Sequence, residues 1–599
     1  MGLLQYAFET YEKHSHLTGR PVEQKEGERR REPLCPVGHI LQKAQLTIEL
    51  DTQGNFVSAS AVDEPTIIPA TEKSASRTSG AEPHPLCDQI DYVAPDNPAK
   101  HEKYLSGLRA WHESEHSHPL LGPVLRYVQS GSIASDLKRV MPETILTEDG
   151  SFGKGKISGM DYQKCLIRWV VGGVRCWEDQ SLFAAYQRYS AATMEGEKGL
   201  CMLSGEIDTI AKTHDKGIIP AINGAKLISS NDIQGFTFRG RFTEASQACT
   251  IGYTASQKAH KALRWLAVNQ GVNMAGRTFI CWNPKGLRVV EPMRGLPGLN
   301  MRGDRPATPT EYRENLKNTL LGYRNELSAT EKVVIAAFDA ATTGRMALTY
   351  YSELTGSDFL DHVENWYSTC CWPNGRFGPQ APDILKIAHL AFGTQRQMRV
   401  EADERIVKPT VQRLYRCIAD GERLPADIVR ALVLNASQPQ RYDTSSQWAL
   451  LHAACALVRK YRNDEAKREE WTMSLDKQKK DRSYQFGRLL ALMETVERRT
   501  YEDKDSKRET NAQKMRSRFC QRPLETAERL DRAVAPYFAK LDKGLYKFYK
   551  DEISAIMEQI SLCGGDANAP LEDTYLMGYY LQRTNYKTAE TEENEDVNA

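Results

Sequence analysis

The spacing of apolar residues changes near residue 310, and this change constrains the fold more than any other feature of the chain. Before it, alternation at residues 44–50 predicts a strand followed by a hairpin turn at 51–54, and amphipathic stretches at 3–11 and 100–137 predict helices. Beyond it, almost every apolar run repeats at three and four residues, which is typical of helices. These further helices are expected at residues 320–338, 362–366, 384–392, 409–418, 428–434 and 446–461. We therefore predict an α+β fold, with a mixed α/β N-terminal body containing short antiparallel strands and a helical remainder.

The end of the chain has its own pattern. Four more helices are expected at residues 484–496, 524–541, 545–560 and 575–581, and short connections such as 542–544 favour antiparallel neighbours in a bundle. The last twelve residues are acidic and almost free of apolar side chains. We expect four regions: a mixed α/β body at 1–310, a helical middle region at 311–472, a helical bundle at 473–587 and an acidic disordered tail at 588–599.

The total charge does not indicate a polyanion partner, because 79 Lys and Arg residues almost balance 78 Asp and Glu residues. The distribution is uneven, however, since residues 459–522 are dense in Lys and Arg. No apolar run approaches the roughly 20 residues of a membrane span, and the N-terminus lacks a signal-peptide pattern. The 13 cysteines include no CxxC pair. These features favour a cytoplasmic protein with reduced, mostly buried thiols.

Residues 112–116 match the HExxH pattern, in which His112 and His116 on one helical face would hold zinc and Glu113 would act as a base. A zinc-dependent hydrolase is therefore the alternative function. The motif runs directly into Pro119, which ends a helix, so we favour the interpretation of a solvated helix end.

Residues 150–157 come close to a phosphate-binding P-loop, but Ile157 stands where the magnesium-binding Ser or Thr would be. A glycine-rich hairpin tip is the favoured interpretation. The sequence also contains no GxSxG elbow, and its carboxylates are plentiful but do not form the Asp, Glu and His pattern that a metal-dependent nuclease would need. We predict no catalytic residues, no metal and no cofactor, and thus a protein that is not an enzyme.

Residues 225–241 combine a strand-like run with small polar groups, aromatic side chains and cations. Amides and hydroxyls can contact base edges, aromatic rings can stack on bases, and cations can contact phosphates. A helix carrying Lys258, Lys261 and Arg264 follows and could extend the positive surface. The alternative is a strand and a β-turn in which Phe236 and Phe238 belong to the core.

Several separated segments resemble, in order, the large subunit of type I-C CRISPR Cascade surveillance complexes. They are residues 199–206 (GLCMLSGE), 213–218 (THDKGI), 226–241, 343–346 (TGRM) and 575–583 (YLMGYYLQR). The resemblance implies a non-catalytic subunit that recognises a short motif adjacent to the target, promotes duplex opening, stabilises the R-loop and helps recruit a separate helicase-nuclease. The guide RNA would read the target sequence. A purely structural scaffold remains a third possibility.

The same resemblance implies the partners. They are guide RNA and target DNA, the backbone and guide-end-capping subunits of the complex, the helicase-nuclease, and small subunits that are translated separately from the same gene. Met473 is the internal start that we would test for these small subunits.

The expected DNA contacts follow from the residue types in these segments. Contacts to the adjacent motif and the duplex are expected from Lys73, Arg77, Lys226, Ser229, Ser230, Asn231, Gln234, Arg239 and Arg241. Contacts to the displaced strand are expected from Lys258, Lys261, Arg498, Arg499, Lys514, Arg516 and Arg518. Residues 237–241 depart from the tyrosine-glycine form expected in the family, so the loop is predicted more firmly than any one residue in it.

Overall fold

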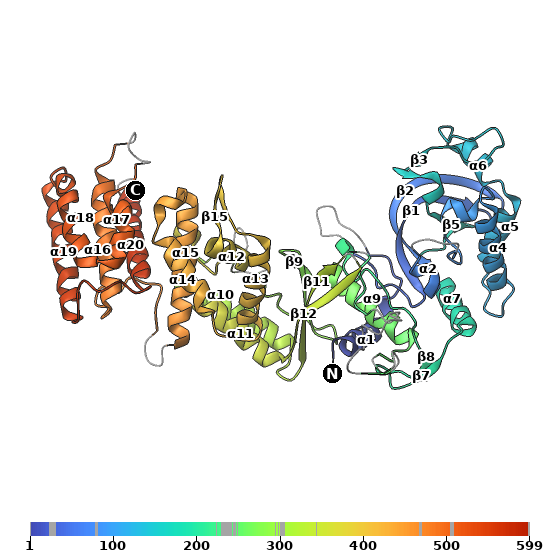
Figure 1. Ribbon diagram of the computed structural model, residues 1–599, viewed down its shortest axis with the longest axis horizontal. Coiled ribbons are helices and arrows are strands. Elements are labelled where there is room, and N and C mark those ends of the chain that lie inside the picture. The colour runs from blue at the N-terminus through green and yellow to red at the C-terminus, as the bar shows by residue number, and fades with distance from the viewer. Residues whose placement is uncertain are drawn as a thin grey trace. The chain divides into compact units, whose positions relative to one another are not determined.

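The computed structural model describes residues 2–22, 31–77, 82–222, 224–228, 242–243, 247, 249–293, 295–296, 299, 306–342, 344–465, 470–502 and 508–596. The chain forms two compact units, whose elements are labelled in Figure 1. The first unit consists of Met1–Gly271, Thr278–Leu287 and Val334–Tyr351, and the second of Val272–Arg277, Arg288–Val333 and Ser352–Ala599. The fold is α+β, as predicted.

The first unit contains a four-stranded sheet in the order β2-β1-β5-β6. Its strands are β1 (His39–Leu50), β2 (Phe56–Pro69), β5 (Ile167–Val171) and β6 (Val174–Arg175). Strand β1 pairs antiparallel with β2 and parallel with β5. The Asp51 carboxylate accepts hydrogen bonds from the backbone N–H groups of Gln53 and Asn55. Gly54 has a φ of +90°, a conformation that would be strained for a residue with a side chain. The predicted strand and the hairpin turn are both confirmed.

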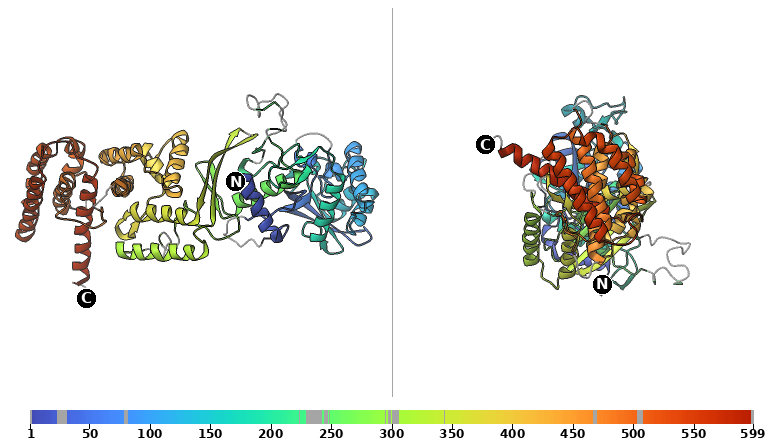
Figure 2. Two further views of the ribbon diagram at one scale, coloured as in Figure 1. Left: turned by 90° about the horizontal axis from the view of Figure 1, so that it is seen from below. Right: turned by 90° about the vertical axis from the view of Figure 1, so that its left-hand side faces the viewer.

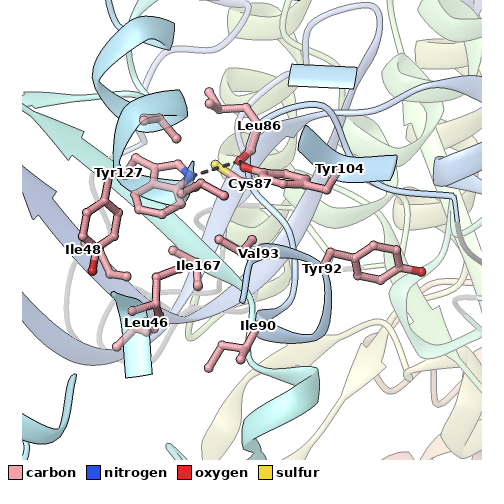
Figure 3. Close-up of a cluster of buried hydrophobic side chains, with 14 of the residues drawn as sticks. Leu46, Ile48, Leu86, Cys87, Ile90, Tyr92, Val93, Tyr104, Tyr127 and Ile167 are labelled. Carbon is pink, nitrogen blue, oxygen red and sulfur yellow. Dashed lines mark hydrogen bonds between the residues drawn. The ribbon is translucent and has the colours of Figure 1, made fainter. Parts of the chain in front are cut away.

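Helices cover one face of this sheet: α3 (Ile90–Val93), α4 (Pro98–His112), α5 (Leu121–Ser130), α6 (Ile133–Val140) and α7 (Gln180–Thr193). Alternate residues of a strand point to the same face, so Leu46, Ile48 and Leu50 of β1 enter the core together. Figure 3 shows this core, where Tyr104 donates its hydroxyl hydrogen bond to the Leu86 carbonyl. Each such side chain contributes on the order of 1.5–3 kcal/mol when buried.

A second core lies between helices α1 (Leu3–Lys13) and α9 (Tyr253–Asn269) and the strands β10 (Arg277–Trp282), β11 (Lys332–Thr342) and β12 (Arg345–Thr355). The remaining elements of the first unit are short: α2 (Glu72–Ala75), the pair β3 (Lys156–Ile157) and β4 (Met160–Asp161), and the pair β7 (Lys198–Leu200) and β8 (Ile207–Thr209).

The prediction of one helix over residues 320–338 is wrong. Helix α10 (Pro309–Glu326) ends at Glu326, and β11 begins six residues later. Residues 334–338 are an uninterrupted apolar run that is fully buried and paired with β10. Such a run fits a buried strand as well as a buried helix, so periodicity alone does not distinguish them.

The second unit is mainly helical. Its helices include α11 (Gly356–Thr369), α12 (Ile384–Phe392), α13 (Glu404–Ala419), α14 (Ala426–Ala436) and α15 (Thr444–Glu465), each of which contains a predicted helix. The short strands β9 (Val272–Met274), β13 (Trp372–Pro373), β14 (Pro379–Gln380), β15 (Thr394–Arg396) and β16 (Arg399–Glu401) also belong to it.

The last helices form the predicted bundle: α16 (Arg482–Arg499), α17 (Asn511–Gln521), α18 (Pro523–Phe538), α19 (Lys543–Leu562) and α20 (Tyr575–Asp596). Helix α16 packs against the other four, and Figure 2 shows α20 as one long helix that continues beyond the predicted start of the acidic tail. A Cβ at Gly487 would lie 1.9 Å from the Tyr575 carbonyl oxygen, and one at Gly578 would lie 2.1 Å from the Tyr484 carbonyl oxygen. These two glycines let the backbones of α16 and α20 touch.

Across the described residues, no helix is both long and apolar enough to cross a bilayer.

Candidate functional site

A polar pocket with a volume of about 510 Å³ lies in the first unit. Four segments that are far apart in the sequence form its wall: the start of β1, the end of α2, residues 215–216 and one face of α9. Five cations line it: Lys43, Arg77, Lys216, Lys261 and Arg264. We call it the Lys216 pocket.

Four of these cations have a carboxylate partner. Arg264 pairs with Glu32 at 2.8 Å and Lys261 with Asp215 at 2.9 Å. Arg77 and Lys43 are bound just as closely, each 2.8 Å from its partner, which is Asp88 and Asp63 respectively. Among the described residues, Lys216 has no such partner. In the part of the chain that the structure describes, each lining cation other than Lys216 therefore has a carboxylate partner.

Two cations act on Lys216 with the same sign of charge as its own. Burial lowers the pKa of Lys216, and the neighbouring cations Lys226 and Arg77 lower it further. The backbones of Lys216 and Lys226 form an antiparallel bridge, so the two lysines stay adjacent. An anion at this point would reverse the repulsion.

Lys226 is anchored by its backbone on both sides. Its N–H donates to the Gly344 carbonyl at 3.1 Å, and its carbonyl accepts the Met346 N–H at 3.0 Å. Residues 213–218, 226 and 344–346, which carry part of the family resemblance, thus meet in one place. No local sequence signal predicts this meeting, because the segments are joined only by tertiary pairing.

Buried histidines lie in and behind the wall of the pocket. Burial lowers the pKa of His39 to about 3 and that of His84 and His214 to about 4, so all three are neutral at neutral pH. His260 donates from Nδ1 to the Ser256 carbonyl at 2.8 Å, which leaves its Nε2 as an acceptor. Within the described part of the chain, the buried Nε2 atoms of His84, His214 and His260 have no hydrogen-bond partner.

The predicted contacts near this pocket fall in different environments. Lys73 is exposed on α2. Arg77 is bound to both carboxylate oxygens of Asp88, donates to the Glu82 carbonyl and lies over the Tyr92 ring, so several contacts hold it in place. Lys261 is buried against Asp215. Lys258 is paired with Glu12 and lies outside the pocket. Six further predicted contacts lie outside the described residues: Ser229, Ser230, Asn231, Gln234, Arg239 and Arg241.

The predicted cations of the bundle divide into an inner and an outer set. Arg516 is only 4% exposed and lies over the Tyr579 ring, whereas Lys514 and Arg518, two positions away on either side, are exposed. Residues two apart on a helix face different directions, which explains the division. Arg498 pairs with Glu494 at 2.9 Å, and Arg499 donates to the Tyr549 hydroxyl at 3.0 Å.

Two glutamates in the bundle are each surrounded by three arginines. Glu494 is 1% exposed and contacts Arg498, Arg516 and Arg583, which we call the buried glutamate cluster. Burial alone would raise the pKa of Glu494, but the three guanidinium groups outweigh it and lower the pKa to about 2. The second cluster, which we call the exposed glutamate cluster, consists of Glu525 with Arg518, Arg522 and Arg529. Sequence reasoning missed Glu494, because its partners come from three different helices.

The HExxH match does not form a zinc site. Helix α4 ends at His112, Glu113 caps its C-terminus, and His116 lies on the turn that follows. The two histidines therefore do not share one helical face, as the motif requires. The residues that the structure describes contain no group of three or more His, Cys, Asp or Glu side chains that could hold a metal. The interpretation of a helix end is confirmed.

The glycine-rich segment begins at a hairpin tip. Residues 146 and 152 form an antiparallel bridge, and the turn between them contains Gly150 at a φ of +82°. Further along, a Cβ at Gly155 would lie 2.4 Å from the Tyr162 ring, so this backbone faces an aromatic side chain. The segment forms a packed loop, with no cradle for phosphates there.

Comparison with known proteins identifies the chain as a whole. No curated protein matches the sequence. The family described as CRISPR-associated protein (Cas_Csd1) matches residues 20–587. This match includes the Lys216 pocket, the segments that meet beside it and all five helices of the bundle as far as residue 587. The protein therefore belongs to the Cas_Csd1 family of CRISPR-associated proteins.

Proposed function

We propose that this chain is the non-catalytic large subunit of a type I-C surveillance complex. In this function, the guide RNA selects the target while the protein recognises the short adjacent motif, promotes duplex opening and holds the R-loop open. It acts in the cytoplasm together with backbone and guide-end-capping subunits, and it helps recruit a separate helicase-nuclease that cuts the DNA. Membership of the Cas_Csd1 family supports this proposal. The observation that carries it is the meeting of residues 213–218, 226 and 344–346 beside a cation-lined pocket.

The adjacent motif would be read from the segment that begins at Lys226. Because the Lys226 backbone is held on both sides by residues 344 and 346, the beginning of this segment has a fixed position in the first unit. Ser229, Ser230, Asn231 and Gln234 would contact base edges, since hydroxyl and amide groups can both donate and accept hydrogen bonds there. Arg239 and Arg241, together with Lys73 and Arg77, would contact phosphates and set the register.

The displaced strand would follow the exposed cations of the bundle. Lys514 and Arg518 are four residues apart on α17 and therefore lie on one face of it. Such a row contacts phosphates without reading sequence. Residues 473–587 would also be made as a separate small subunit starting at Met473. In the full chain Met473 is buried, with its sulfur 3.5 Å from the sulfur of Cys371.

Binding of the assembled complex to target DNA tests the proposal. Asn231→Ala should weaken binding to DNA with the correct adjacent motif by roughly tenfold, because one amide contact to a base is worth about 1–3 kcal/mol. Binding to DNA of unrelated sequence should not change. Filter binding at one fixed salt concentration measures both affinities. Equal losses on the two DNAs would contradict a base-reading role, and a complex with no affinity for target DNA would contradict the function.

A further inference from the structure

We infer that the Lys216 pocket binds a phosphate group of a nucleic-acid strand. The inference rests on the proposed function, because it assigns a chemical class of ligand to the pocket beside which residues 213–218, 226 and 344–346 meet.

The charge of the pocket favours an anion. Arg77, Lys261 and Arg264 are each held by a largely buried carboxylate at 2.8–2.9 Å, so they contribute fixed structure more than free charge. Lys43 pairs with Asp63 at 2.8 Å near the surface. Lys216 stands apart from them in the described chain, and its close neighbours are the cations Lys226 and Arg77. The adjacent side chains of Lys216 and Lys226 repel each other, and a phosphate beside them turns this repulsion into attraction.

Neutral hydrogen-bonding groups surround the same space. The amide residues Gln42 and Gln89 and the hydroxyl residue Ser76 also line the pocket. They supply donors to phosphate oxygens without a competing negative charge.

The carboxylates of the wall do not oppose an anion. Glu32 is bound by Arg264 through two hydrogen bonds. Asp215 is bound by both Lys261 and Gln257. Cations of the protein thus already neutralise the negative charges of Glu32 and Asp215. The volume of about 510 Å³ accommodates a phosphate with its adjoining sugar, since small-ligand sites span roughly 300–1,000 Å³.

Calorimetry and fluorescence anisotropy with the isolated full-length chain test the inference. The probes are inorganic phosphate and a short single-stranded oligonucleotide that carries either a 5′-phosphate or a 5′-hydroxyl. Lys216→Ala should weaken phosphate binding about tenfold, the loss expected for one charge-assisted hydrogen bond. Lys154→Ala removes the same charge from an exposed position outside the pocket and should change nothing.

The two oligonucleotides distinguish the source of the phosphate. Tighter binding of the 5′-phosphorylated strand that disappears in Lys216→Ala would assign the pocket to a strand end. Equal binding of both strands, with an equal loss in Lys216→Ala, would assign it to an internal phosphodiester.

The inference is overturned if Lys216→Ala binds phosphate and both strands as the unchanged protein does, or if neither strand binds. Lys216→Gln keeps the length and polarity of the side chain and replaces Lys216→Ala if the latter does not fold. The test contains neither guide RNA nor target duplex, so its failure leaves the adjacent-motif experiment untouched. Conversely, phosphate binding by a chain whose complex ignores target DNA would contradict only the proposed function.

Discussion

The buried and the exposed glutamate clusters have the same composition and opposite surroundings. Each has one glutamate and three arginines, and helix α17 contributes to both, with Arg516 facing inward and Arg518 facing solvent. In the exposed cluster, water and salt screen the charges, and the arginines remain able to exchange Glu525 for another anion. In the buried cluster, Glu494 and its three arginines neutralise one another and are not available to another ion. Basic residues in a sequence therefore indicate a nucleic-acid surface only after their helical face is known.

Replacing the central glutamate of each cluster, one at a time, should give the largest difference in stability between the two clusters. Glu494→Gln leaves three guanidinium groups without their buried counter-charge, so we expect the free energy of unfolding to fall by about 3–5 kcal/mol. Glu525→Gln is the matched control and should change stability little, because its partners are exposed. Urea unfolding followed by circular dichroism measures both. Equal effects would erase the distinction between the two clusters.

Lowering the pH should remove the stability that Glu494 contributes to the buried cluster, and we expect this effect to be smaller than that of the substitution. The pKa of Glu494 is about 2 in the folded chain, against an ordinary value of 4.5. The unfolded chain therefore takes up this proton first as the pH falls. The stability that Glu494 contributes is fully present above pH 4.5 and is lost between pH 4.5 and 2. The difference in melting temperature between the unchanged protein and Glu494→Gln should thus shrink across this range, and a constant difference would contradict the assignment.

Removing one exposed cation should have the smallest effect. Arg518→Ala should leave stability unchanged but lower the affinity for single-stranded DNA of any sequence. It should also reduce the slope of log affinity against log salt by about 0.7, because the variant neutralises one phosphate fewer. Arg405→Ala, an exposed arginine of the second unit outside the bundle, is the control. An unchanged slope in Arg518→Ala would remove α17 from the path of the displaced strand.

Local patterns predicted much of the fold, and long-range pairing explains the rest. The alternation at residues 44–50 and the spacing in α12 to α16 were sufficient, because each pattern lies within one element. Residues 334–338 were misassigned because a wholly buried strand lacks alternation. The site was harder to predict. Arg77 and Lys216 lie 139 positions apart and meet in one pocket through tertiary structure alone, and the inward direction of Arg516 depends on where α16 and α20 lie.

The paired glycines of α16 and α20 have a consequence for how the bundle can be made. Gly487 and Gly578 allow the backbones of α16 and α20, the first and the last helix of residues 473–587, to be in direct contact. A shorter polypeptide that ends before α20 would leave α16 without the helix against which it packs most closely. Any separate polypeptide translated from this part of the gene must therefore contain both α16 and α20 to keep this fold.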